Sequence, residues 1–259
     1  MKVVILCGGQ GTRMREETEF RPKPLVNIGN HPILWHIMQT YAHHGHNDFV
    51  LCLGYKGTMI KEYFLNYEAF SNDLTVHLGS IRSIDIHANS APPSDFTVTL
   101  ADTGDQTMTG GRIKRIQKYI DDDTFMVTYG DAVSDIDIDK LLAFHQSHGR
   151  LATVSCVRPP SRFGSLALGH GARVAAFNEK PRLEGWVNAG FFVFNVGVFD
   201  YLGGDDCVLE QGPLDRLAQD GQLRAYRHSG IWYPMDTYRE VLMLNELWAA
   251  GDAGWKVWS

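Results

Sequence analysis

A glycine-rich turn, one arginine and one lysine near the start of the chain are its strongest candidates for chemistry. The turn, Gly8-Gly-Gln-Gly-Thr-Arg13, directly follows a short apolar run. A glycine turn after a buried strand presents bare backbone N–H groups, which bind phosphate in α/β proteins. Arg13 and Lys23, the latter held between Pro22 and Pro24, would add full positive charges beside the turn. These residues predict a binding site for a nucleoside polyphosphate.

Two common phosphate-binding motifs do not fit this turn. A dinucleotide fingerprint needs a third glycine at position 14, which is Met14, and an acidic residue about 20 positions on, where Asn30 and its neighbours offer none. The P-loop pattern G-x-x-x-x-G-K-[ST] does not occur. A plain tight turn without a ligand is the simpler alternative. Three glycines in four positions are conformationally costly, however, and a simple turn does not need the Thr-Arg that follows.

Two aspartates that lie far apart in the sequence are candidate metal ligands. Asp131 follows Gly130 at the end of the apolar segment 124–129, and Asp236 follows Pro234-Met235. Ligands of open α/β sheets bind at the carboxyl ends of strands, and Mg²⁺ is held by one or two carboxylates together with substrate phosphates and water. We therefore expect a magnesium site. The structural alternative is a turn or helix cap for Asp131 and a helix N-cap for Asp236.

A second group of possible metal ligands, His43-His44-x-His46, lies at the end of a predicted helix. Histidines are favoured there by the helix dipole, since the C-terminus carries partial negative charge. We therefore expect no metal at these histidines.

The elements that must position these residues alternate between strand and helix over the first 150 residues. Apolar runs predict strands at 3–6, 49–53, 74–77, 96–100, 124–129, 152–157 and 191–194, and helical spacing predicts helices at 32–44, 58–65, from 113 onward, at 138–148 and in a long segment ending near 248. This alternation predicts an α/β fold with a Rossmann-like, mostly parallel, doubly wound sheet. The polar segment 80–95 predicts a protruding loop or hairpin. We expect one domain over 1–259 with an insertion at about 66–100.

The composition argues against several classes of protein. With 259 residues, of which 44% are hydrophobic, the chain is long enough to bury a full core. Its net charge of −6 argues against binding to nucleic acid, which needs a positively charged surface. No apolar run approaches the ~18–20 residues of a membrane span. The cysteines are scattered without a C-x-x-C pair, which argues against disulfides and zinc. The first apolar run is too short for a signal peptide. We expect a cytoplasmic protein with no nucleic-acid or membrane partner.

The motifs, taken in order, resemble one enzyme family. The glycine turn and Arg21-Pro-Lys-Pro24 resemble the signature of the sugar nucleotidyltransferases, and the resemblance covers essentially the whole chain. The other segments that carry it are Pro32-Ile-Leu-Trp-His-Ile-Met38, Gly54-Tyr-Lys-Gly57, Ile60-Lys-Glu-Tyr-Phe64, Thr103-Gly-Asp105, Met108-Thr-Gly-Gly-Arg112, Thr128-Tyr-Gly-Asp131, Arg162-Phe-Gly164, Glu179-Lys-Pro181, Asn188-Ala-Gly-Phe-Phe192 and Pro234-Met-Asp-Thr237. The resemblance implies the family's fold and the transfer of a nucleotidyl group to a sugar 1-phosphate, with release of pyrophosphate.

Within the family, the resemblance implies CTP and α-D-glucose 1-phosphate as substrates and CDP-glucose as the product. It implies catalytic roles for Lys23, Arg13 and Asp131, with Mg²⁺ on Asp131 and Asp236. The nucleotide-binding residues that it implies are Leu6, Gly8, Gly9, Gly11, Thr12, Arg13, Lys23, Thr109, Gly110, Gly111 and Arg112. The backbone of 109–111 would read the pyrimidine edge, and Arg112 would reach phosphate or base. The sugar-phosphate residues that it implies are Tyr129, Gly130, Glu179, Lys180, Asn188 and Gly190. It also implies a homo-oligomer, a trimer or a hexamer, and a role in nucleotide-sugar and O-antigen or polysaccharide biosynthesis.

Three alternatives stay open. Ala132 and the short segment 182–186 leave room for a different phosphorylated acceptor. The nucleotide could be UTP or dTTP. The chain could also be a catalytically silent nucleotide-binding homologue, although a silent protein has no chemical need to keep all five charged residues expected to hold phosphate and metal.

Overall fold

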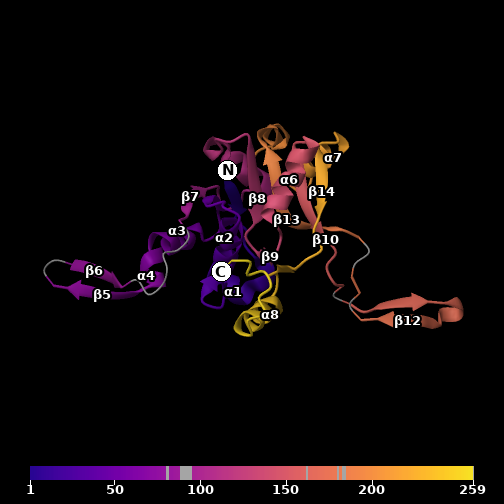
Figure 1. Cartoon of the computed structure of the whole chain (residues 1–259), viewed down its shortest axis with the longest axis horizontal. Coiled ribbons are helices and arrows are strands. Elements are labelled where there is room, and N and C mark those ends of the chain that lie inside the picture. The colour runs from indigo at the N-terminus through magenta and orange to yellow at the C-terminus, as the bar shows by residue number, and fades with distance from the viewer. Residues whose placement is uncertain (80–81, 88–94, 162, 180, 183–184, 259) are drawn as a thin grey trace.

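A seven-stranded sheet runs through the centre of the molecule in the computed structural model (Figure 1). The structure describes every residue except 80–81, 88–94, 162, 180, 183–184 and 259. In order across the sheet, the strands are β14 (Leu223–Arg227), β10 (Ala152–Val157), β13 (Val187–Asn195), β8 (Thr124–Tyr129), β1 (Val3–Leu6), β4 (Asp48–Leu53) and β7 (Thr97–Asp102). Neighbouring strands are parallel except at β13, which is antiparallel to both β10 and β8. The predicted α/β fold with a mostly parallel sheet is confirmed.

Helices cover both faces of this sheet, so it is doubly wound. The side chains of β1 alternate between two cores: Val3 and Ile5 belong to one, and Val4 belongs to the other. The first core also receives side chains from α2 (Ile33–His43), α3 (Gly57–Leu65), α6 (Ile138–His148) and α8 (Tyr238–Ala249), and the second receives them from α5 (Thr109–Arg115) and α7 (Pro213–Gln219). Among the described residues, no helix is both long enough and apolar enough to cross a bilayer.

Local sequence signals explain where the predicted helices begin and end. Helix α2 starts directly after Pro32, and the chain turns at Gly45, whose φ is 78°. Helix α6 is capped by Asp137, whose side chain accepts a hydrogen bond from Lys140 N at 2.9 Å, and it ends at Gly149 with φ 61°. These two helices are confirmed to within a residue at each end.

Two hairpins project from the body on opposite sides (Figure 1). One is the antiparallel pair β5 (Asp73–Leu78) and β6 (Arg82–His87), and the other is the pair β11 (Ser165–Leu168) and β12 (Val174–Asn178). The strand predicted at 74–77 therefore lies in a hairpin, whereas the strand predicted at 96–100 is β7 of the central sheet. The last residues of the range 66–100, for which we expected an insertion, therefore belong to the central sheet. The second hairpin was not expected.

Short elements connect the sheet to its helices and bring distant residues together. They are α1 (Arg15–Thr18), α4 (Tyr67–Ser71), the paired strands β2 (Asn27–Ile28) and β3 (His31–Pro32), the paired strands β9 (Ala132–Ser134) and β15 (Trp232–Pro234), and 3₁₀ turns at Thr12–Met14, Lys23–Leu25, Gln117–Tyr119, His170–Ala172 and Val196–Tyr201. The β9–β15 pair matters most, because it continues into a hydrogen bond from Met235 N to Asp131 O at 2.8 Å. That bond places the two candidate metal ligands side by side.

Candidate active site

The glycine turn lies at the carboxyl end of β1, beside the end of β8. From β1 the sheet continues through β4 and β7 on one side and through β8 on the other, so this is the point where the strand order reverses and where open α/β sheets bind ligands. Gly11 has φ +61°, and a Cβ atom there would lie 2.7 Å from the Thr18 side chain. Gly9, by contrast, is exposed and has open space around a Cβ position. The turn therefore offers free backbone surface at Gly9 and requires glycine at Gly11 for its own shape.

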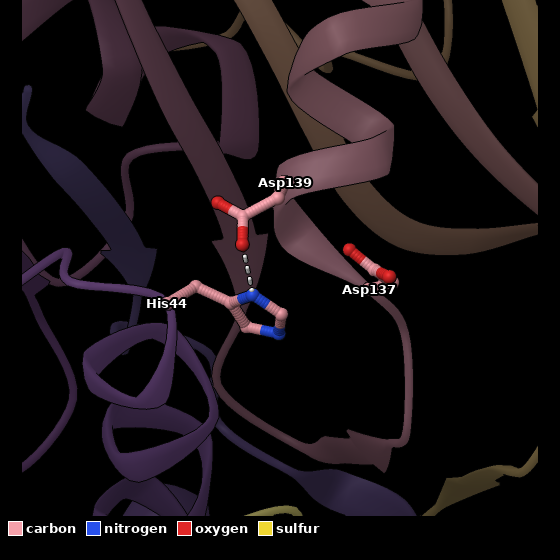
Figure 2. Close-up of side chains that lie close together, drawn as sticks. All are labelled: His44, Asp137 and Asp139. Atoms are coloured by element: carbon pink, nitrogen blue, oxygen red, sulfur yellow. Dashed lines mark hydrogen bonds and ion pairs between the residues drawn. The ribbon is translucent and has the colours of Figure 1, made fainter.

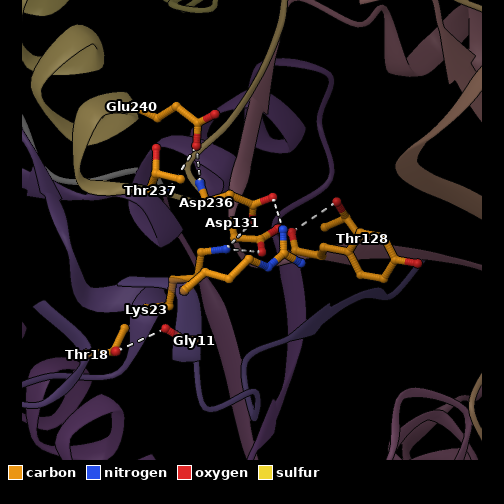
Figure 3. A network of polar contacts seen from close by, with 10 residues as sticks. Gly11, Thr18, Lys23, Thr128, Asp131, Asp236, Thr237 and Glu240 are labelled. Atoms are coloured by element: carbon orange, nitrogen blue, oxygen red, sulfur yellow. Dashed lines mark hydrogen bonds and ion pairs between the residues drawn. The ribbon is translucent and has the colours of Figure 1, made fainter. Parts of the chain in front are cut away.

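Lys23 is the centre of a charged network at this end of the sheet (Figure 3). Its Nζ donates to Asp131 Oδ2 at 2.6 Å and to Asp236 Oδ1 at 2.7 Å, and its side chain is only 12% exposed. Burial lowers the pKa of Lys23, but the charge and hydrogen bond of Asp131, together with those of Asp236, outweigh it and raise the pKa above its ordinary value. Lys23 is thus a fixed cation at neutral pH.

Asp236 is held in this network by the start of helix α8. Glu240 Oε2 accepts hydrogen bonds from Asp236 N at 2.7 Å and from Thr237 N at 2.8 Å, which completes a capping box with Thr237 as the N-cap. Thr237 therefore caps the helix, and the Asp236 carboxylate is left to bond Lys23 and Arg13. The Nη1 atom of Arg13 donates to Asp236 Oδ2 at 2.8 Å, while the Arg13 side chain stays 74% exposed.

The oxygen atoms of this network suit a hard divalent cation. Asp131 and Asp236 direct carboxylate oxygens at one point, which the Lys23 ammonium group holds in this structure. Mg²⁺ takes oxygen ligands from one or two carboxylates and completes its shell with substrate phosphates and water. The donor set therefore fits this metal.

The opposite wall of the site is built around Tyr129, the last residue of β8. Its ring packs against Gly190, where a Cβ atom would lie 2.4 Å from the ring. Its hydroxyl accepts a hydrogen bond from Asn188 Nδ2 at 3.2 Å and donates to Glu210 Oε1. Glu210 also accepts from the hydroxyl of Thr109, at 2.7 Å.

A pocket of about 420 Å³ lies between these walls. Its lining residues are Leu6, Cys7, Gly8, Gly9, Gln10, Gly11, Thr12, Arg13, Lys23, Pro24, Asp105, Gln106, Thr107, Met108, Thr109, Arg112, Tyr129, Gly130, Asp131 and Asp236. This volume is in the range of small-molecule binding sites. Arg13, Lys23 and the exposed backbone of the glycine turn lie at one end of the pocket and suit a phosphorylated ligand.

Comparison with known proteins decides the family. The profile of the nucleotidyl transferase family matches residues 2–216. The chain belongs to this family. It is 50% identical over 260 residues to a glucose-1-phosphate cytidylyltransferase of Salmonella typhimurium, with 100% of both chains covered. It is 29% identical over 251 residues to a mannose-1-phosphate guanyltransferase of Neurospora crassa, covering 93% of this chain and 62% of the relative.

A solved structure shows the same fold. The crystal structure of UDP-glucose pyrophosphorylase complexed with UDP-glucose superposes with a TM-score of 0.65 at 15% identity, covering 96% of this chain and 98% of the other. The predicted nucleotide-diphospho-sugar transferase fold is therefore confirmed.

Most of the residues expected at the site of this transferase do line the pocket. They are Leu6, Gly8, Gly9, Gly11, Thr12, Arg13, Lys23, Thr109, Arg112, Tyr129, Gly130, Asp131 and Asp236. Asn188 and Gly190 stand behind Tyr129 rather than in the lining. Because these residues come from the two ends and the middle of the chain, only the folded sheet brings them together.

The glycines of the 108–112 segment have a different role from the expected one. The N–H groups of Gly110 and Gly111 donate to Cys207 O at 2.8 and 3.1 Å, and a Cβ atom at Gly110 would lie 2.6 Å from Cys207 Sγ. These N–H groups are therefore not available to read a pyrimidine edge. The glycines let helix α5 pack tightly against the loop 203–209. The helix begins at Thr109 rather than at Ile113, where we expected it to begin.

Arg112 likewise differs from the expectation that it reaches phosphate or base. It is buried, and its guanidinium donates to the carbonyls of Leu53, Gly104, Gly8 and Asp105 and to the Thr103 hydroxyl, at 2.7 to 3.3 Å. Burial lowers its pKa. The guanidinium holds the glycine turn and the 103–105 segment together from behind, so Arg112 positions the turn while adding a positive charge beneath it.

The structure does not bring Glu179 to the pocket. Glu179 is exposed and follows β12 on the second projecting hairpin. Its carboxylate lies near Gly164 at the base of that hairpin, where a Cβ atom would lie 3.2 Å away. Lys180, expected beside it, lies outside the described residues.

His44, at the end of α2, bonds to the first turn of α6 (Figure 2). His44 Nδ1 lies 2.8 Å from Asp139 Oδ2, and ligand atoms of His44, Asp137 and Asp139 all lie within 4.8 Å of one another. Asp137 is already committed as the N-cap of α6 and pairs with Lys140 at 2.8 Å. This geometry serves the helix termini.

Sequence reasoning missed part of the pocket wall. Asp105, Gln106 and Thr107 line it, and the signal that could have found them is their position just after β7 at the same edge of the sheet. Glu210 was also missed, because no local motif marks it.

Proposed function

We propose that this transferase moves the cytidylyl group of CTP to α-D-glucose 1-phosphate, forming CDP-glucose and pyrophosphate. The observation that carries the proposal is the cluster of Lys23, Arg13, Asp131 and Asp236 beside a glycine turn in one pocket. The choice of nucleotide and sugar is supported by the full-length 50% identity to the Salmonella glucose-1-phosphate cytidylyltransferase.

The reaction is an in-line displacement. An oxygen of the sugar phosphate forms a bond to the α-phosphorus of CTP, the bond to the bridging oxygen breaks, and pyrophosphate leaves with that electron pair. The attacking phosphate is already ionised at neutral pH, so the reaction needs no protein base. The difficulty is to bring two anions together and to stabilise the charge that builds up at the α-phosphoryl group.

The residues at the carboxyl end of β1 provide fixed positive charge that attracts the two anions and stabilises the charge at the α-phosphoryl group. Lys23 stabilises the α-phosphoryl group, and Arg13 with the amides of Gly9 and Gly11 holds the departing phosphates. When bound, Mg²⁺ neutralises phosphate charge, and Asp131 and Asp236 are the residues that would hold it. Arg112 acts from behind the turn by keeping its backbone in place.

The residues at the β8 end form the sugar side. Tyr129 and Gly130 line it, while Asn188 and Gly190 fix the Tyr129 ring. Lys180 and Glu179 are proposed for the phosphate and the hydroxyls of the sugar. For Glu179 this role requires the base of the β11–β12 hairpin to approach the pocket when substrate binds.

We also propose a homo-oligomer. The two projecting hairpins expose apolar side chains, among them Leu78 at 82% and Leu168 at 68%. Exposed apolar surface of this kind is typical of protein contacts. Light scattering at several protein concentrations tests this proposal, and a monomer at all of them would contradict it.

The test of the activity is pyrophosphate release with Mg²⁺, crossing CTP, UTP, dTTP, ATP and GTP against a panel of sugar 1-phosphates. We expect release with CTP and glucose 1-phosphate. Release with CTP and another acceptor would reassign the sugar, and release with another nucleotide would reassign the base. Nucleotide binding without any turnover would identify a silent homologue.

A further inference from the structure

Glu210 lies directly behind the pocket and connects its two ends. Its Oε2 accepts a hydrogen bond from Thr109 Oγ1 at 2.7 Å, and its Oε1 accepts one from the Tyr129 hydroxyl. Thr109 and Tyr129 both line the pocket, whereas Glu210 is half-buried and is not among the described residues of the lining. One carboxylate therefore holds the hydroxyl groups of two residues that line the pocket.

On the Thr109 side, this carboxylate belongs to a loop that is tightly bonded to the start of α5. The Thr109 hydroxyl also accepts from Leu209 N at 2.9 Å, and Met108 N donates to Asp205 O at 2.7 Å. Thr109 and the loop that carries Glu210 are therefore held together by several hydrogen bonds.

On the Tyr129 side, the hydroxyl accepts one hydrogen bond and donates another. It accepts from Asn188 Nδ2, whose Oδ1 in turn accepts from Gly190 N at 2.8 Å. Its own proton is directed at Glu210, and hydrogen bonds to a carboxylate are stronger than those between neutral groups.

We propose that Glu210 is a positioning residue that couples the nucleotide end of the pocket, at Thr109, to the sugar-phosphate end, at Tyr129. The assignment of the two ends rests on the proposed function. Because both hydroxyl bonds share one carboxylate, nucleotide contact at Thr109 fixes Tyr129 for the acceptor, and the reverse holds equally.

Cross-effects of two small substitutions test this coupling. Thr109→Val and Tyr129→Phe each remove one hydroxyl and keep the side-chain shape. Thr109→Val should raise the KM for glucose 1-phosphate about tenfold although it lies at the nucleotide end, and Tyr129→Phe should raise the KM for CTP by a similar factor. The double variant should lose much less than the product of the two single losses, since either substitution already breaks the relay.

Glu210→Gln supplies the decisive background. The glutamine side chain keeps one hydrogen-bond acceptor, its carbonyl oxygen, and has an NH₂ donor in place of the second carboxylate oxygen. In this background, adding Thr109→Val should change the KM for glucose 1-phosphate less than about twofold. Asp206→Asn is the matched control, because it removes an exposed carboxylate from the same loop and should leave both KM values and kcat unchanged.

Turnover of the wild-type enzyme with each nucleotide and sugar 1-phosphate tests the proposed function, and this test is independent of the coupling through Glu210. If the wild type uses another nucleotide or acceptor, the same cross-effects are measured with that pair. If Glu210→Gln does not fold, as judged by its thermal melt, the two single variants and their double carry the test. Losses that multiply to within about twofold, or KM changes confined to the local substrate, would overturn the coupling.

Discussion

Replacing Lys23 by methionine tests the charged network most directly. Methionine keeps most of the side chain's length and removes the ammonium group, which lies 2.6 Å from Asp131 and 2.7 Å from Asp236. Removing one charged group that stabilises a transition state typically costs ~3–4 kcal/mol of barrier, so kcat should fall about 10²- to 10³-fold. The matched control is Lys140→Met, which breaks an exposed Lys–Asp pair of similar length, 2.8 Å, away from the pocket. It should change kcat less than about twofold.

The same substitution has a second, independent consequence for stability. Without the cation, Asp131 and Asp236 face each other as like charges, but their side chains are 33% and 22% exposed and water partly solvates them. We expect the free energy of unfolding to fall by about 1–2 kcal/mol. Mg²⁺ should restore stability, because it replaces the missing positive charge between the two carboxylates. The wild type, whose carboxylates are already neutralised by Lys23, should gain less.

Two assays measure these effects. Pyrophosphate release under saturating substrates gives kcat, and thermal melts with and without Mg²⁺ give the change in stability. A loss of kcat below tenfold in a folded Lys23→Met variant would refute the catalytic assignment. A Mg²⁺-induced rise in melting temperature no larger than that of the wild type would refute the shared site for Lys23 and the metal.

Three further predictions follow from single residues. Gly9→Ala should leave the free energy of unfolding within about 0.5 kcal/mol of the wild type, because a Cβ atom there meets no other atom within 4 Å. The same substitution should raise the KM for CTP at least about tenfold, because the added methyl group blocks close approach of phosphate to the backbone. An unchanged KM would exclude such an approach at Gly9. Arg112→Met should lower the free energy of unfolding, measured by urea titration, by about 3–5 kcal/mol, because five oxygen acceptors lose a buried charged donor. A loss under about 1 kcal/mol would contradict the role of Arg112 in holding the glycine turn in place. Burial lowers the pKa of His36 from 6.5 to about 4, so the unfolded chain binds this proton first as the pH falls. The free energy of unfolding should therefore be about 1 kcal/mol lower at pH 5.5 than at pH 7.5 from this residue alone, and His36→Asn should flatten that dependence in urea titrations at the two pH values.

The sequence predicted the parts of the site that depend on local patterns. The strand before Gly8, the carboxylate after β8 and the helix 138–148 all carry short-range signals: an apolar run, a turn residue, a cap. The roles of Gly110, Gly111 and Arg112 depend instead on partners 59 to 104 positions away, namely Cys207 and the carbonyls of Gly8 and Leu53. A glycine pair before a helix has the same letters whether it faces a ligand or a packed loop, so only the fold distinguishes the two.

The exposed hairpins show a different limit. Residues 165–168 and 174–178 pair with each other as antiparallel strands, but nothing in their sequence says that such strands would leave the central sheet. Sheet membership is decided by which neighbours the strand meets. The same limit moved the strand at 74–77 out of the sheet and kept Glu179 away from the pocket.

The last 43 residues complete a site of which the family match contains all but one lining residue, Asp236. The matched region ends at residue 216, yet Asp236 bonds both Lys23 and Arg13. Helix α8 also holds the segment that follows Lys23, because Asn245 Oδ1 accepts from Gly29 N at 2.9 Å and the Trp248 ring occupies the space beside that glycine. One helix thus fixes a carboxylate through its capping box and the far end of the lysine segment through its body. The packing of α8 against β2 therefore helps to set the distance between the Lys23 ammonium group and the Asp236 carboxylate, so the closing helix shapes the pocket together with the glycine turn near the start of the chain.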